Sequence, residues 1–185
     1  MRRRRSAIIV ALATTMLLLV PGSALADSGA QTYDLVATAP NFGVAANGDR
    51  VAVTGSGTFS IHPESVSASG SFTHFDSGGA VVGGGTWTAT ELLAFHSYGC
   101  GVLTFTDPDT IIPSNLCGGI LKLRVELVTP AGTVDGILTV FCIIGEHAPA
   151  SHTFPSPGEG VTLNVPGVIN FSHTDGGMNV FIKTS

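Results

Sequence analysis

This sequence contains very little positive charge beyond its first few residues. Of its eight lysines and arginines, four lie between Arg2 and Arg5, whereas all 13 acidic residues lie at or after Asp27. A chain processed before Asp27 would therefore keep four basic and 13 acidic residues, a formal net charge of −9. Nucleic-acid binding requires a basic surface that displaces counterions from phosphate, and anionic membranes attract basic proteins. The charge balance excludes nucleic acid as a partner and disfavours an anionic membrane surface.

The sequence also lacks the short motifs that would identify a reaction. It has no Gly-x-Ser-x-Gly nucleophile motif, no EF-hand register and no closely spaced Cys/His ligand pair. The glycine-rich stretch 78–85 lacks the lysine and the helix that follow the glycines of a phosphate-binding loop. We therefore predict no metal and no cofactor, and we identify no enzyme class from motifs.

The N-terminus has the pattern of a secretory signal peptide. A cluster of arginines is followed by an apolar stretch over 7–20 and by Ala-Leu-Ala at 24–26. Small residues at the first and third positions of such a triplet favour cleavage directly after it. The apolar stretch is shorter than the roughly 20 residues needed to span a bilayer. We predict a cleavable signal over 1–26, a single secreted domain over 27–185, and no membrane anchor after processing.

The three cysteines all lie after the predicted cleavage site, where an oxidising compartment permits a disulfide. Cys100 and Cys117 flank a stretch rich in proline, aspartate and asparagine, which is typical of a long loop between two strands. Cys142 lies within an apolar run, where a small buried thiol packs well. Three cysteines permit three single pairings. We predict the pair Cys100–Cys117 and a free Cys142.

Alternating polar and apolar residues predict an all-β fold. Short turns rich in glycine and proline separate the alternating segments, which favours antiparallel hairpins. Several segments are ten residues or longer, and closing the sheet would remove the exposed edges of such long strands. We predict a single closed antiparallel β-barrel of about eight or nine strands, with a two-sheet β-sandwich or jelly roll as the alternative. The expected strands are 33–39, 50–61, 65–75, 86–97, 119–129, 133–144, 160–165, 168–173 and 179–183.

Four aromatic residues are expected on the inner face of this barrel. The alternation of faces along a strand places Trp87, Phe95, Phe59 and Phe72 among the inward side chains, beside glycines that would leave room in a cavity. Ligand pockets are mostly apolar and concave. These four residues are therefore our candidates for binding a small hydrophobic molecule.

Three ionisable residues share an apparently inward face with apolar neighbours. Glu91 lies between Trp87 and Phe95 in its strand, and His74 and His173 lie near strand ends. A carboxylate among aromatics loses hydration, so it must find a partner or take up a proton. Histidines at a barrel rim, or a bulge that turns Glu91 outward, would give the same pattern without any function. A metal triad of these residues has no supporting ligand spacing.

These observations leave three functional interpretations open. The first is a secreted binding protein that holds a small hydrophobic molecule in its interior. The second is a structural or surface-interaction protein with a packed core. The third is a barrel enzyme of the cyclase or isomerase type that uses Glu91 with His74 or His173 as acid and base. The sequence does not determine the oligomeric state.

Overall fold

The computed structural model describes residues 29–103, 111–150 and 158–185. The predicted signal peptide over 1–26 and its cleavage site lie outside the described residues. Within them the chain forms no α-helix, and none of these residues belongs to a helix long and apolar enough to cross a membrane.

Ten antiparallel strands account for the described fold. Each predicted strand is found, and in most of them β-branched, aromatic or leucine side chains alternate with polar residues or glycine. The strand expected over 86–97 begins earlier than predicted, because the glycines at 83–85 also belong to it. The strands are β1 (Thr32–Val44), β2 (Arg50–Ile61), β3 (Glu64–Phe75), β4 (Val81–Cys100), β5 (Leu116–Thr129), β6 (Gly132–Cys142), β7 (Gly160–Val165), β8 (Ile169–Phe171), β9 (His173–Thr174) and β10 (Val180–Lys183).

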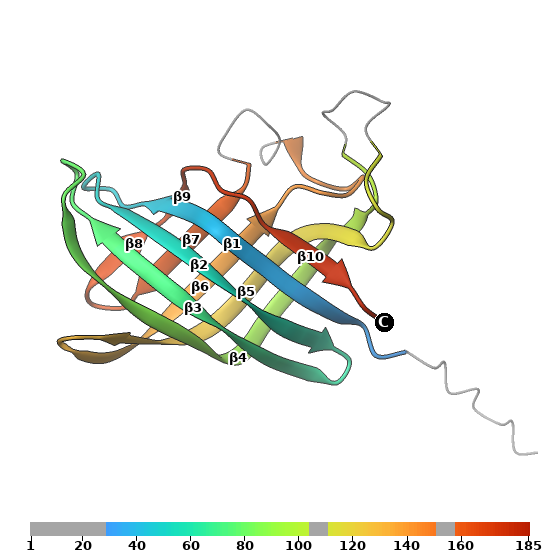
Figure 1. Ribbon diagram of the computed structural model, residues 1–185, viewed down its shortest axis with the longest axis horizontal. Coiled ribbons are helices and arrows are strands. Elements are labelled where there is room, and N and C mark those ends of the chain that lie inside the picture. The colour runs from blue at the N-terminus through green and yellow to red at the C-terminus, as the bar shows by residue number, and fades with distance from the viewer. Residues whose placement is uncertain (1–28, 104–110, 151–157) are drawn as a thin grey trace, which may run out of the picture.

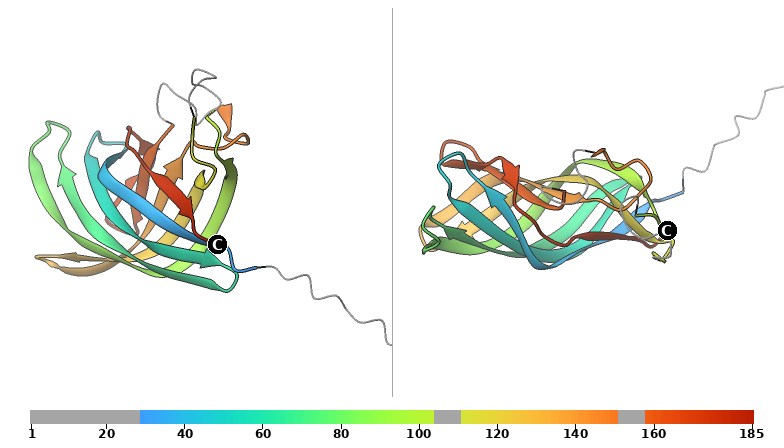
Figure 2. Two further views of the ribbon diagram at one scale, coloured as in Figure 1. Left: turned by 45° about the vertical axis from the view of Figure 1, so that its right-hand side comes forward. Right: turned by 90° about the horizontal axis from the view of Figure 1, so that it is seen from above.

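The strands form one continuous sheet that curls back on itself (Figures 1 and 2). Its order is β10-β1-β2-β3-β4-β5-β6-β7-β8, and β10 also pairs with β5. That second pairing closes a ring of six strands, β10-β1-β2-β3-β4-β5. The all-β antiparallel class and the closure of the sheet are therefore confirmed. The closed ring contains six strands where we expected eight or nine, and it does not run evenly round an axis.

The two ends of the sheet are built differently because β5 shares one edge between two partners. Leu116 and Cys117 pair with β10, which closes the ring there, whereas the following residues of β5 pair with β6. From that point β6, β7 and β8 continue the sheet toward the other end, and β9 pairs with the end of β1. We call the β10 side the closed end and the opposite side the mouth.

A disulfide joins β4 and β5 at the closed end. Cys100 and Cys117 are bonded, as predicted, and they lie directly opposite each other in the β4–β5 ladder. Cys142 is free and buried at the end of β6, also as predicted. The disulfide can form because the two cysteines lie at the two ends of the long connection between β4 and β5, where these strands meet.

Candidate ligand-binding site

An apolar pocket of about 390 Å³ opens at the mouth of the barrel. It lies where the ends of β3, β5 and β7 meet the starts of β2, β4 and β6, at the left of Figure 1. We call it the mouth pocket. Its lining residues are Val51, Phe72, His74, Val82, Gly83, Gly84, Leu127, Thr129, Pro130, Ala131, Val134, Leu163, Val165, Val168, Ile169 and Phe171.

His74 is the only ionisable side chain among these lining residues. Its Nε2 lies 3.0 Å from Oδ2 of Asp49, which precedes β2. The imidazole and the ring of Phe171 pack edge to face, with centroids 5.2 Å apart and planes at 87°. The hydrogen bond from His74 lowers the pKa of the Asp49 carboxyl. The carboxylate therefore remains charged at neutral pH and fixes the imidazole in one orientation.

Exposed valines surround the mouth pocket. Val82 is 56% exposed and Val168 is 71% exposed, and both line the pocket. Val134 also lines it, and it is 40% exposed. Exposed apolar side chains that gather around one opening are typical of a binding site, whereas isolated ones are ordinary surface. An occupant of the mouth pocket would shield this apolar surface from water.

The opposite, closed end is filled by aromatic rings. Tyr33 stacks on Phe59 at 5.2 Å, and the ring of Phe95 lies 5.0 Å from Tyr33 and 4.9 Å from Phe59. Phe181 of β10 completes this cluster, at 5.7 Å from Phe59. Of the four aromatic residues proposed as ligand contacts, Phe59 and Phe95 therefore pack against protein, and only Phe72 lines the mouth pocket.

Trp87, the fourth of these residues, fills space that we expected to be a cavity. A Cβ atom built on Gly55 would lie 2.3 Å from Cζ2 of Trp87, and one on Gly70 would lie 2.6 Å from Nε1. The indole Nε1 donates a hydrogen bond of 2.9 Å to the carbonyl of Thr54. The glycines leave room for the tryptophan ring and not for a ligand, so the middle of the barrel is packed.

The prediction that Glu91 faces inward is wrong. Register shifts between Ala89 and Glu91 and between Leu92 and Ala94 interrupt the pairing of β4 with β5. Each such bulge changes which face the following side chains occupy. Glu91 is exposed, and its Oε2 lies 2.8 Å from Nε of Arg124 on the outer face. It therefore has no access to the barrel interior.

The prediction that His173 faces inward is also wrong. The alternation that buries Phe171 ends with β8, and the chain then moves across to pair with β1 as β9. His173 is exposed, and its Nδ1 lies 3.0 Å from the hydroxyl of Ser172. Of the three ionisable candidates, only His74 lines the mouth pocket, whereas Glu91 lines a separate pocket with Glu64 and Thr90. Among the described residues no group of three His, Cys, Asp or Glu side chains could hold a metal.

Asp49 could not be recognised as a partner of His74 from the alternation of polar and apolar residues. This residue belongs to the turn between β1 and β2, and turn aspartates usually bond to their own backbone. Its proximity to His74 follows from the β2–β3 ladder, in which Arg50 pairs with Phe75 and Val51 pairs with His74. The hairpin register would have revealed this contact, because Asp49 directly precedes the first residue of the ladder.

Comparison with protein-family models, with curated proteins and with solved structures found no match for this chain. The geometry of the pockets is therefore the basis for assigning a function to this protein.

Proposed function

We propose that this protein is exported and binds a small hydrophobic molecule in the mouth pocket. The observation that carries the proposal is an apolar, open pocket with a single ionisable side chain, His74, held in place by Asp49. Ligand sites commonly combine an apolar wall with a few fixed polar groups. The ligand is apolar over most of its surface and carries one hydrogen-bonding group that lies against His74.

The size and setting of the mouth pocket support this proposal. A volume of about 390 Å³ lies within the range of roughly 300–1,000 Å³ that is usual for small-molecule sites. Burial of apolar surface contributes about 25 cal/mol per Å², so wall contacts with valine, leucine and phenylalanine supply most of the affinity. His74 then fixes the orientation of the ligand.

A neutral lipophilic dye, N-phenyl-1-naphthylamine, tests this proposal by its fluorescence. Gly83 lines the pocket, and a Cβ atom there would meet nothing closer than Cβ of His74 at 3.8 Å. Gly83→Leu would fill the pocket, and Thr86→Leu would place the same side chain on the exposed face of the same strand. We expect at least about tenfold weaker dye binding for Gly83→Leu and no change for Thr86→Leu. Equal binding by the two variants would contradict the proposal.

Export is supported by the N-terminal pattern, and the disulfide is compatible with an extracellular location. N-terminal sequencing of the protein purified from its source tests this step. We expect the mature chain to begin at Asp27. A mature chain that retains the apolar stretch 7–20 would contradict export by a cleavable signal.

The packed interior favours the structural protein as the second candidate. The cluster of Tyr33, Phe59, Phe95 and Phe181 fills the closed end of the barrel, and the buried Trp87 fills its middle. A protein that binds no dye at the mouth would fit this second interpretation. The enzyme interpretation retains only His74 with Asp49, because Glu91 and His173 face solvent.

A further inference from the structure

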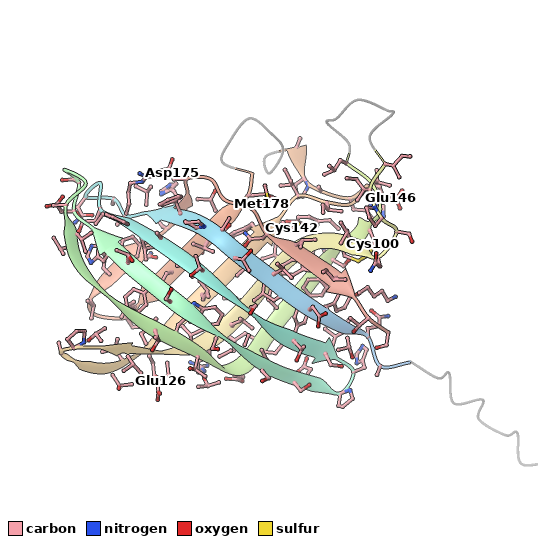
Figure 3. All side chains as sticks on the ribbon, viewed as in Figure 1. Cys100, Glu126, Cys142, Glu146, Asp175 and Met178 are labelled. Atoms are coloured by element: carbon pink, nitrogen blue, oxygen red, sulfur yellow. A yellow bond between two sulfur atoms is a disulfide. The ribbon has the colours of Figure 1, made fainter. Side chains whose placement is uncertain are left out.

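A second pocket, of about 580 Å³, lies beside β10 and is separate from the mouth pocket. It lies between the end of β6, the start of β7 and the segment that leads into β10, and we call it the side pocket. Figure 3 labels Cys142 and Met178 in this region, above β10. Its described lining residues are mostly apolar side chains or glycine. They include Leu116, Ile143, Ile144, Glu159, Met178 and Val180.

Glu159 is the only ionisable side chain among the described lining residues of the side pocket. Its Oε1 accepts a hydrogen bond of 3.2 Å from the backbone N–H of Ile143. Its carboxyl also interacts with the backbone N–H of Asn179 and with the thiol of Cys142. All three partners are neutral, so no described cation balances the carboxylate. Burial raises the pKa of Glu159, which is the expected result for a carboxyl with incomplete compensation.

Asn179, whose backbone N–H contacts Glu159, has a buried side-chain acceptor without a donor. Its side chain is 3% exposed, and its Nδ2 donates to the carbonyls of Phe141 and Gly160 at 3.1 and 3.2 Å. Its Oδ1 is buried and accepts no hydrogen bond. A buried acceptor without a donor costs roughly 1–3 kcal/mol, so native proteins normally satisfy it. Asn179 also lines the side pocket.

We propose that the side pocket binds a small organic cation: a primary ammonium group attached to an apolar body. Glu159 has no positively charged partner among the described residues and Oδ1 of Asn179 has no donor, whereas an ammonium supplies a positive charge together with N–H donors. The leucine, isoleucine, methionine and valine side chains around Glu159 would contact the apolar body. An ammonium is also attracted by the charge of the Glu159 carboxylate, which a neutral hydroxyl is not, and this Coulomb attraction provides the selectivity.

The two pockets are then expected to bind different kinds of ligand, the mouth pocket a neutral one and the side pocket a cation. In the mouth pocket the one ionisable residue, His74, already has a charged partner in Asp49, so a neutral ligand suffices. In the side pocket Glu159 has no such partner among the described residues. Binding at the side pocket does not depend on the proposed function of the mouth pocket, so either proposal can be wrong while the other is right.

The test compares 1-naphthylmethylamine with 1-naphthylmethanol, two probes that differ only in the ammonium and hydroxyl groups. Equilibrium dialysis at neutral pH measures both affinities for the processed protein carrying Gly83→Leu, which blocks the mouth pocket. We expect the amine to bind on the order of tenfold more tightly than the alcohol. Glu159→Gln keeps an oxygen that accepts from Ile143, and we expect it to bring the two affinities within twofold of each other.

Two results would overturn the proposal. Equal affinities for the amine and the alcohol in the protein with intact Glu159 would mean that the carboxyl only joins the chain segments around Ile143 and Asn179. An amine preference that survives Glu159→Gln would place the cation elsewhere. The first comparison needs no substitution in the side pocket, so it decides the question even if Glu159→Gln fails to fold.

Discussion

The closed end and the mouth of this barrel come from the same alternating pattern, yet one is filled and the other is open. At the closed end β10 bridges β1 and β5, and four aromatic rings from four strands meet inside the ring. At the mouth β6 replaces β10 beside β5, and the inward residues are mostly valine, leucine and glycine. The difference shows that side-chain volume, and not alternation, determines where a barrel is hollow.

We expect the largest difference in stability between the two ends when one aromatic side chain is truncated at each end. Phe59 is 1% exposed and contacts three other aromatic rings, so Phe59→Ala should lower the free energy of unfolding by about 3–5 kcal/mol. Phe72 borders the mouth pocket and is partly exposed, so Phe72→Ala should lose less than half as much. Urea denaturation measures both values. Equal losses would mean that the two ends are packed alike.

Removal of the disulfide should affect stability at the closed end without affecting the mouth. The double variant Cys100→Ser with Cys117→Ser should lose about 3 kcal/mol, because the bridge no longer restricts the unfolded chain. The folded variant should bind N-phenyl-1-naphthylamine with unchanged affinity, since β10 and the mouth lie at opposite ends. A tenfold loss of dye affinity in the folded variant would contradict this separation.

A single added methyl group distinguishes a packed interior from a hollow one. Gly55→Ala would place a Cβ atom 2.3 Å from the Trp87 ring, and overpacking of this kind costs about 1–3 kcal/mol. The matched control is Gly83→Ala at the mouth, where the nearest atom is 3.8 Å away, and we expect almost no loss of stability. If Gly55→Ala proved as harmless as Gly83→Ala in urea denaturation, the interior beside Trp87 would be empty.

The smallest expected effect concerns the pH dependence of stability at the mouth. The pKa of Asp49 is lowered by its hydrogen bond to His74, so the ionised carboxylate stabilises the folded state. This contribution is complete above the unfolded value of roughly 3.9 and is lost as the pH falls through the lowered folded value. Asp49→Asn should therefore flatten the decline in stability below about pH 5. Urea denaturation at a series of pH values measures it, and identical pH profiles would show that the pair contributes nothing.

The strands and most side-chain faces could be predicted from the sequence, because alternation is local information. His74 follows its strand's alternation and lines the mouth pocket, as that pattern indicates. Glu91 does not follow the alternation, because the bulge between Ala89 and Glu91 depends on how β4 pairs with β5, whose Arg124 lies 33 residues further along the chain. Such bulges leave no clear mark in a single strand. Whether a residue beyond a bulge faces inward or outward therefore depends on how its strand pairs with the neighbouring strands.

The candidate site was less predictable than the fold. Gly55 and Gly70 indicate missing side-chain volume, but only the packed structure shows that Trp87 occupies that volume. Asp49 reaches His74 through hairpin register, and Glu159 meets Ile143 and Asn179 through contacts between three separate segments. These side-chain arrangements arise from tertiary contacts that periodicity alone does not specify.

The most direct test of the account is a map of where the neutral dye binds. Titration of ¹⁵N-labelled protein with N-phenyl-1-naphthylamine should shift the backbone amide resonances of Val51, His74 and Gly83 at the mouth. The amides of Phe59, Phe95 and Phe181 at the closed end should remain unchanged, because their rings pack against one another. Shifts confined to the closed end would show that the interior opens there and would contradict the account.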